Sequence, residues 1–140
     1  MNTFYEILQG IHNYWAYLTL LLVVLTTVIT LMKASKGEKA NLNIKKMGFF
    51  TMMTVHLQLV FGGILYFISP MVIFGAETMK VSELRLYALE HPLMMLIGIV
   101  LVTIANIKLK KAEKITLIIP ILFLSGLILM LSRIPYDNWF

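Results

Sequence analysis

The sequence predicts an all-α integral membrane protein: a single domain over residues 1–140, with four transmembrane helices in an up-down bundle. Three observations predict this class. Hydrophobic residues make up 59% of the chain and charged residues only 14%, whereas soluble domains average about 25% charged residues. The apolar residues form four runs of about 18–25 residues, the length that crosses a ~30 Å hydrocarbon core. None of the runs alternates with a period of two, which excludes the strands of a membrane barrel.

The predicted helices cover residues 7–32, 47–69, 82–107 and 115–132. No basic stretch precedes the first run, and it is too long for the core of a signal peptide, so we expect it to remain as a span. The second and fourth are continuous apolar runs. The third begins at Ser82, a typical N-cap residue. Pro92 predicts either a kink in this helix or a later start.

Lysines orient the predicted bundle. Residues 33–46 hold five lysines and residues 108–114 hold four, which together are nine of the 12 basic residues. The positive-inside rule places both loops in the cytoplasm and both termini outside. Topology and anionic headgroups therefore explain the formal charge of +5. Because no aromatic residues interleave with the lysines to stack bases, we exclude nucleic acid as a partner.

Cysteine is absent from the chain. Disulfides, thiolate metal sites, covalently attached haem and iron–sulfur clusters are therefore excluded. Any metal must be held by nitrogen, oxygen or thioether ligands. No nucleophile elbow, phosphate loop or metalloprotease motif is present, so no catalytic residue is predicted.

All three histidines, His12, His56 and His91, lie on predicted spans. At 1.5 Å per residue, His12 and His91 fall at a similar depth in the outer half, and His56 lies roughly 8–10 Å deeper. Imidazoles are costly in hydrocarbon and mark functional sites. Three of them on separate helices predict a shared pocket in the bundle core.

Two glycines follow histidines at a seven-residue spacing: Gly63 after His56, and Gly98 after His91. Seven residues are nearly two turns, so each glycine shares a face with its histidine. Such a bare stripe predicts room for a flat macrocycle beside an imidazole. The alternative is that the glycines only let neighbouring helices approach each other.

Charged residues near the outer ends of the spans complete the candidate site. Glu90 is expected to orient an imidazole, to pair with Arg133 or to carry protons, unless it reaches the interface. Arg85 and Arg133 offer planar forks that bind carboxylates. Their alternative partners within the chain are Glu83 and Asp137.

Several segments resemble a known family. They are residues 12–14 (HNY), residues 56–63 (HLQLVFGG) with Tyr66, residues 85–95 (RLYALEHPLMM) and residues 133–136 (RIPY). Over nearly its whole length the chain resembles small four-helix bacterial membrane proteins described as cytochrome b-like. The resemblance implies non-covalent haem b and electron transfer in the bacterial cytoplasmic membrane. Three histidines allow at most one bis-histidine haem, whereas the best-known b-type bundles hold two.

The leading hypothesis is therefore a haem b protein that transfers electrons, with a quinone or a redox protein as candidate partner. His56 and His91 are the expected axial ligands, and His12 is an alternative ligand or polar neighbour. Arg85 and Arg133 are expected to meet the haem propionates.

Two further hypotheses stay open. Three histidines and Glu90 form a credible first set of ligands for a zinc or copper ion. The chain could also be an accessory subunit without a cofactor, in a homo-oligomer or a larger membrane complex.

Overall fold

The computed structural model describes residues 3–139, and this part of the chain contains helices and no β-strand. The predicted all-α class is thereby confirmed. In chain order the elements are α1 (Thr3–Ser35), α2 (Leu42–Ile68), α3 (Ala76–Lys80), α4 (Ser82–Arg85), the π-helical turn η1 (Leu86–Glu90), α5 (His91–Lys111), α6 (Ile118–Ser132) and the 3-10 turn η2 (Tyr136–Asn138).

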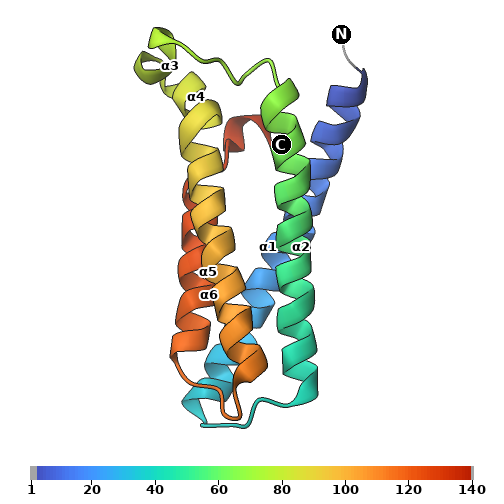
Figure 1. Ribbon diagram of the computed structural model, residues 1–140, viewed down its shortest axis with the longest axis vertical. Helices are drawn as coiled ribbons and strands as arrows, with labels where there is room; N and C mark the ends of the chain where they lie inside the picture. The colour runs from blue at the N-terminus through green and yellow to red at the C-terminus, as the bar shows by residue number, and fades with distance from the viewer. Residues whose placement is uncertain (1–2, 140) are drawn as a thin grey trace.

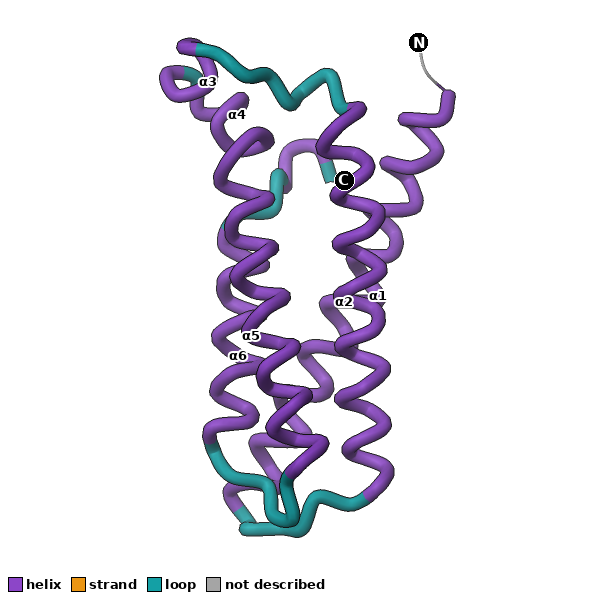
Figure 2. The backbone as a smooth tube through the Cα atoms, viewed as in Figure 1, coloured by secondary structure: helices purple, strands orange, loops and turns teal. Residues whose placement is uncertain are grey.

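The four longest helices, α1, α2, α5 and α6, lie side by side along the long axis (Figure 1). Helix α1 packs against α2 and α6, and α5 packs against the same two helices. The α1–α2 and α5–α6 loops lie together at one end, and the chain termini lie toward the other (Figure 2).

Within residues 3–139, three helical segments are long and apolar enough to cross a membrane: Thr3–Ser35, Leu42–Ile68 and Ser82–Lys111. Each overlaps one of the first three predicted spans. The first is longer at both ends, the second begins earlier and ends one residue sooner, and the third begins at the predicted residue and ends later. Helix α6 has only 15 residues and is shorter than its predicted range. The segment before α6 pairs with the other loop instead: Lys114 forms an antiparallel bridge with Lys39, and the Ile115 N–H donates to the Glu38 carbonyl at 3.0 Å.

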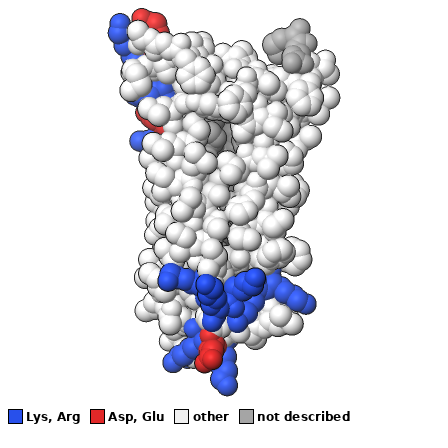
Figure 3. Space-filling view, viewed as in Figure 1, with Lys and Arg blue, Asp and Glu red and all other residues white. Residues whose placement is uncertain are grey.

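The outer surface is apolar over most of its height. Large apolar side chains are exposed on every long helix, and Phe67 is 87% exposed. On the face that Figure 3 shows, basic side chains gather near the loop end, the middle carries no charged side chain, and charged side chains reappear at the opposite end near α3 and α4. An apolar surface of this extent is compatible with a membrane protein, because hydrocarbon solvates it.

Threonines join α1 to α2. Thr26 Oγ1 and Thr51 Oγ1 lie 2.7 Å apart. One turn or more away, Thr19 Oγ1 and Trp15 Nε1 both donate to the Thr54 carbonyl, at 3.4 and 3.0 Å. Hydroxyl groups in transmembrane helices find partners on neighbouring helices in this way. These threonines were not among the predicted site residues, although they cluster on two adjacent spans of the sequence.

Glycines join α5 to α6. A Cβ added to Gly98 would lie 3.0 Å from the Gly126 carbonyl oxygen, and a Cβ added to Gly126 would lie 2.9 Å from the Gly98 carbonyl oxygen. Gly98 therefore lets α5 and α6 approach each other closely. The sequence left two interpretations of this glycine open, helix contact and room for a macrocycle, and this contact agrees with the first.

The two lysine-rich loops are joined to each other. The Ala40 N–H donates to the Glu113 carbonyl at 2.9 Å, beside the Ile115–Glu38 bond described above. The Lys33 Nζ donates to Glu38 Oε2 at 2.9 Å, and this bond holds the pKa of the Glu38 carboxyl below its ordinary value.

Candidate functional site

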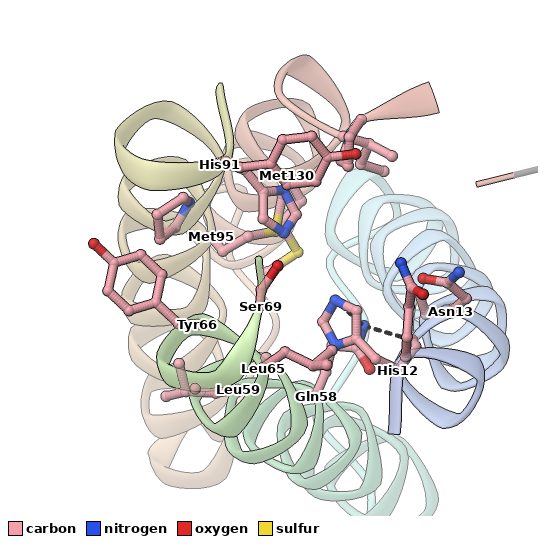
Figure 4. Close-up of a pocket in the computed structure, with 18 of the residues that line it drawn as sticks. His12, Asn13, Gln58, Leu59, Leu65, Tyr66, Ser69, His91, Met95 and Met130 are labelled. Atoms are coloured by element: carbon pink, nitrogen blue, oxygen red, sulfur yellow. Dashed lines mark hydrogen bonds between the residues drawn. The ribbon is translucent and has the colours of Figure 1, made fainter. Parts of the chain in front are cut away.

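A cavity of about 550 Å³ lies between the long helices, in the half away from the lysine-rich loops. We call it the histidine cavity, because His12 and His91 are among its lining residues. Figure 4 shows these two side chains projecting toward the cavity from α1 and α5. Most of the lining is apolar. Its size falls within the range of about 300–1,000 Å³ found for small-molecule sites.

The two imidazoles are close together. Their ring centroids are 6.4 Å apart, and their planes are 82° from parallel. An imidazole nitrogen binds a metal at about 2.0–2.1 Å, and that nitrogen lies roughly 1 Å from its ring centre. Two rings on opposite sides of one metal therefore have centroids about 6 Å apart. The observed separation matches this spacing.

His91 is held by a backbone carbonyl. Its Nδ1 lies 2.9 Å from the Arg133 carbonyl oxygen. A carbonyl only accepts, so Nδ1 carries the hydrogen and Nε2 keeps its lone pair. Histidines that bind metals almost always donate their other N–H in this manner, which fixes the tautomer and the ring orientation. This hydrogen bond leaves Nε2 as the nitrogen of His91 that can accept.

His12 has a different environment. Gln58 Nε2 donates to the His12 carbonyl at 2.9 Å and lies 3.5 Å from His12 Nε2. A Cβ on Gly62 would lie 3.0 Å from His12 Cε1, so the absence of a side chain there makes room for the imidazole. Within the described residues, His12 Nδ1 and Gln58 Oε1 are buried without a hydrogen-bond partner. Such orphaned atoms cost about 1–3 kcal/mol each, and a bound water, an ion or a ligand would satisfy them.

His56 lies apart from this pair. Its Nε2 is 2.9 Å from Thr103 Oγ1, which itself donates to the Ile99 carbonyl at 2.7 Å. Thr103 therefore accepts, and His56 Nε2 carries the hydrogen. His56 is not one of the described residues that line the histidine cavity. Thr103 follows His91 by twelve residues, about 18 Å along α5. The structure thus brings together two of the three predicted ligands.

Glu90 binds both arginines. Arg85 Nε lies 2.7 Å from Glu90 Oε1, and Arg133 Nε lies 3.2 Å from Oε2. The predicted Glu90–Arg133 pair is present, and Arg85 pairs with Glu90 in place of Glu83. Because the Arg133 carbonyl holds His91, this cluster also anchors the imidazole. Arg85, Glu90 and Arg133 are not among the described residues that line the histidine cavity. Their net positive charge lies next in sequence to the lining residues Leu89, His91 and Ile134.

The predicted zinc or copper site is not assembled. Within residues 3–139, no group of three or more His, Asp or Glu side chains is arranged to hold a metal ion. His56 is bonded to Thr103, and Glu90 is bonded to the two arginines.

The helix around Pro92 continues on both sides of the proline. The turn η1 precedes it, with the His91 N–H donating to the Leu86 carbonyl five residues earlier. Pro92 has no N–H, so the Ala88 carbonyl lacks its usual helical donor. The Tyr66 hydroxyl donates to that carbonyl at 2.9 Å. This contact between α2 and η1 was not predicted from the sequence, although Tyr66 belongs to the segments that carry the family resemblance.

The end of the described chain closes the outer side of the histidine cavity. Trp139 lines it, stacks on Tyr17 with ring centroids 4.6 Å apart, and donates Nε1 to the Asn13 carbonyl at 3.3 Å. Asn138 Nδ2 donates to the Tyr87 hydroxyl at 2.6 Å. The segment after α6 is therefore tied to both α1 and η1.

Comparison with protein-family models, curated proteins and solved structures finds no match to this chain. The site is accordingly interpreted from its own residues.

Proposed function

We propose that this chain is an integral membrane protein that binds one haem b between His12 and His91 and takes part in electron transfer. The observation that carries the proposal is the pair of imidazoles from two helices, 6.4 Å apart between ring centroids, on one mostly apolar cavity. A bound haem b would supply one-electron redox chemistry. The pair replaces the His56–His91 pair expected from the sequence.

The remaining residues fit this ligand. His91 presents Nε2 while its Nδ1 is held by the Arg133 carbonyl. Arg85 and Arg133 carry more positive charge than Glu90 neutralises, which favours a ligand with carboxylate groups. Gly63 lines the cavity, and a Cβ there would meet nothing within 4 Å. A lipid-soluble quinone is the candidate redox partner, because the cavity lies at a height where the outer surface of the helices is apolar.

The test is an absorption spectrum of the purified chain made with an adequate haem supply. We expect a Soret band that His12→Ala and His91→Ala each abolish and that His56→Ala retains. Thermal unfolding of each variant controls for loss of fold. A wild-type chain without a Soret band rejects haem binding. A band lost in His56→Ala but kept in His12→Ala restores the pair expected from the sequence.

We further propose that α1, α2, the segment Ser82–Lys111 and the shorter α6 form a four-helix up-down bundle in a bacterial cytoplasmic membrane. Both termini would lie outside and the lysine-rich loops inside, as the positive-inside rule requires. Since the chain has no cysteine, single cysteines test this cleanly. An impermeant maleimide should label Ser82→Cys in intact cells, and Ser35→Cys only after disruption. The reverse pattern would invert the topology.

A further inference from the structure

Helix α2 is hydrogen-bonded to α5 at one level and to η1 at another. These two levels bound one side of the histidine cavity. At the deeper level His56 Nε2 donates to Thr103, and at the outer level the Tyr66 hydroxyl donates to the Ala88 carbonyl. His56 and Tyr66 are ten residues apart, about 15 Å along α2. Between these levels no hydrogen bond or ion pair links α2 to α5 in the described residues. Figure 1 shows the two helices diverging here.

The residues that face each other across this interval leave the cavity without a complete wall. Leu59 on α2, and Leu93 and Leu96 on α5, line the cavity and are 38%, 44% and 48% exposed. Gly63 contributes no side chain, and a Cβ there would meet nothing within 4 Å. We call this gap, bordered by Leu59, Gly63, Leu93 and Leu96, the α2–α5 opening. In Figure 4, Leu59 and Tyr66 lie at this edge, across the cavity from Asn13.

Contacts tie together other helices around the cavity. Gln58 and His12 join α2 to α1. His91 joins α5 to Arg133, just beyond α6, and Gly98 lies against Gly126. Figure 3 shows the face that carries α2 and α5 free of charged side chains over the middle of its height. That surface suits contact with hydrocarbon and not with water.

We propose that the α2–α5 opening is the route by which the ligand of the histidine cavity passes laterally between the bilayer core and the cavity. The ligand is therefore a membrane-dissolved molecule with a broad apolar edge. Its identity as the haem tetrapyrrole rests on the proposed function, whereas the route does not. A water-soluble ion or polar metabolite would have to lose its hydration in hydrocarbon to use this path, which is costly.

The first experiment needs no ligand. A nitroxide attached to Gly63→Cys, in vesicles of phosphatidylcholine and phosphatidylglycerol, reports collisions with apolar oxygen and with a water-soluble nickel chelate. We expect strong relaxation by oxygen and little by nickel, as at the lipid-exposed control Leu57→Cys. Ala105→Cys, buried at 0% exposure, should be shielded from both. A Gly63 label that responds to nickel, or to neither reagent, overturns the inference.

The second experiment follows transfer of haemin from donor vesicles into the apoprotein by growth of the Soret band. Leu96→Trp places an indole at the opening. It should slow both uptake and release by about tenfold, the effect of about 1.4 kcal/mol in a barrier. Leu124→Trp is the matched control, because Leu124 on α6 is 42% exposed, close to the 48% of Leu96, and Leu124 is not among the described residues that line this cavity.

The outcomes separate the two proposals. Unchanged rates in Leu96→Trp, or slower uptake with faster release, overturn the lateral route. If the wild-type chain acquires no Soret band at all, the proposed haem function fails, and the nitroxide measurement still decides whether the opening faces lipid.

Discussion

Replacement of Gly126 by alanine should destabilise the protein by forcing α5 and α6 apart. The added Cβ would lie 2.9 Å from the Gly98 carbonyl oxygen and 3.0 Å from Val102 Cγ2. The carbonyl is part of a helix backbone and cannot rotate away. To restore an ordinary separation of about 3.4 Å, the helices must move about half an ångström apart along the contact.

The magnitude follows from two opposing effects. Overpacking of a tight contact costs about 1–3 kcal/mol, while alanine in place of glycine in a helix gains about 0.5–1 kcal/mol. We therefore expect Gly126→Ala to lower the free energy of unfolding by about 0.5–2 kcal/mol. At Gly10, where a Cβ meets nothing within 4 Å, alanine should raise that free energy by about 0.5–1 kcal/mol.

The assay is reversible unfolding in detergent micelles, followed by helical circular dichroism as a denaturing detergent is added. Wild type, Gly126→Ala and Gly10→Ala are measured under one set of conditions, so that only the site of the added methyl group differs. If Gly126→Ala is as stable as Gly10→Ala, the backbones of α5 and α6 do not meet at this point, and the reasoning is refuted.

Three further predictions use the same assay. A double-mutant cycle of Thr26→Val and Thr51→Val should give a coupling of about 0.6 kcal/mol and no more than about 1.7; zero coupling would mean that the two hydroxyls do not bond. Tyr66→Phe should cost about 1 kcal/mol in the wild type and less in Pro92→Ala, whose new N–H can serve the carbonyl that Tyr66 now serves; equal costs would contradict this. The lowered pKa of Glu38 implies a stabilising contribution that is present above the unfolded-state pKa of about 4.3 and is lost as pH falls through the folded-state value. Glu38→Gln should remove that part of the acid-induced loss, and an unchanged pH profile would show that the bond to its lysine partner contributes nothing.

Much of the fold was predictable because it depends on local patterns. Apolar runs and lysine-rich loops placed the first three spans and the connections between them. Counting along the helices also put His12 and His91 at one depth, and these are the two imidazoles that the structure brings together. Depth along a helix follows from a fixed rise per residue, so it needs no knowledge of the neighbours.

The neighbouring helix that each helix face contacts could not be predicted from the sequence. The His56–Gly63 stripe faces α5, where His56 bonds Thr103. The His91–Gly98 stripe faces α6, where Gly98 meets Gly126. The seven-residue spacing shows only that a glycine shares a face with its histidine, not which helix covers that face. Rotation of a helix about its own axis is set by its packing partners, so identical spacings lead to different surroundings.

The pairing between the two lysine-rich loops governs how the molecule can flex. Backbone bonds from Ala40 to Glu113 and from Ile115 to Glu38 join the two helical hairpins at the loop end. At the other end α2 is joined to η1 by the side chain of Tyr66. A widening between α2 and α5 that keeps the backbone bonds must break the Tyr66 hydrogen bond, and its amplitude grows with distance from the loops. Distances between spin labels near Tyr66 and Ala88 should therefore vary more than distances between labels near His56 and Thr103. Substitutions that weaken the bonds between the two loops should change both sets of distances.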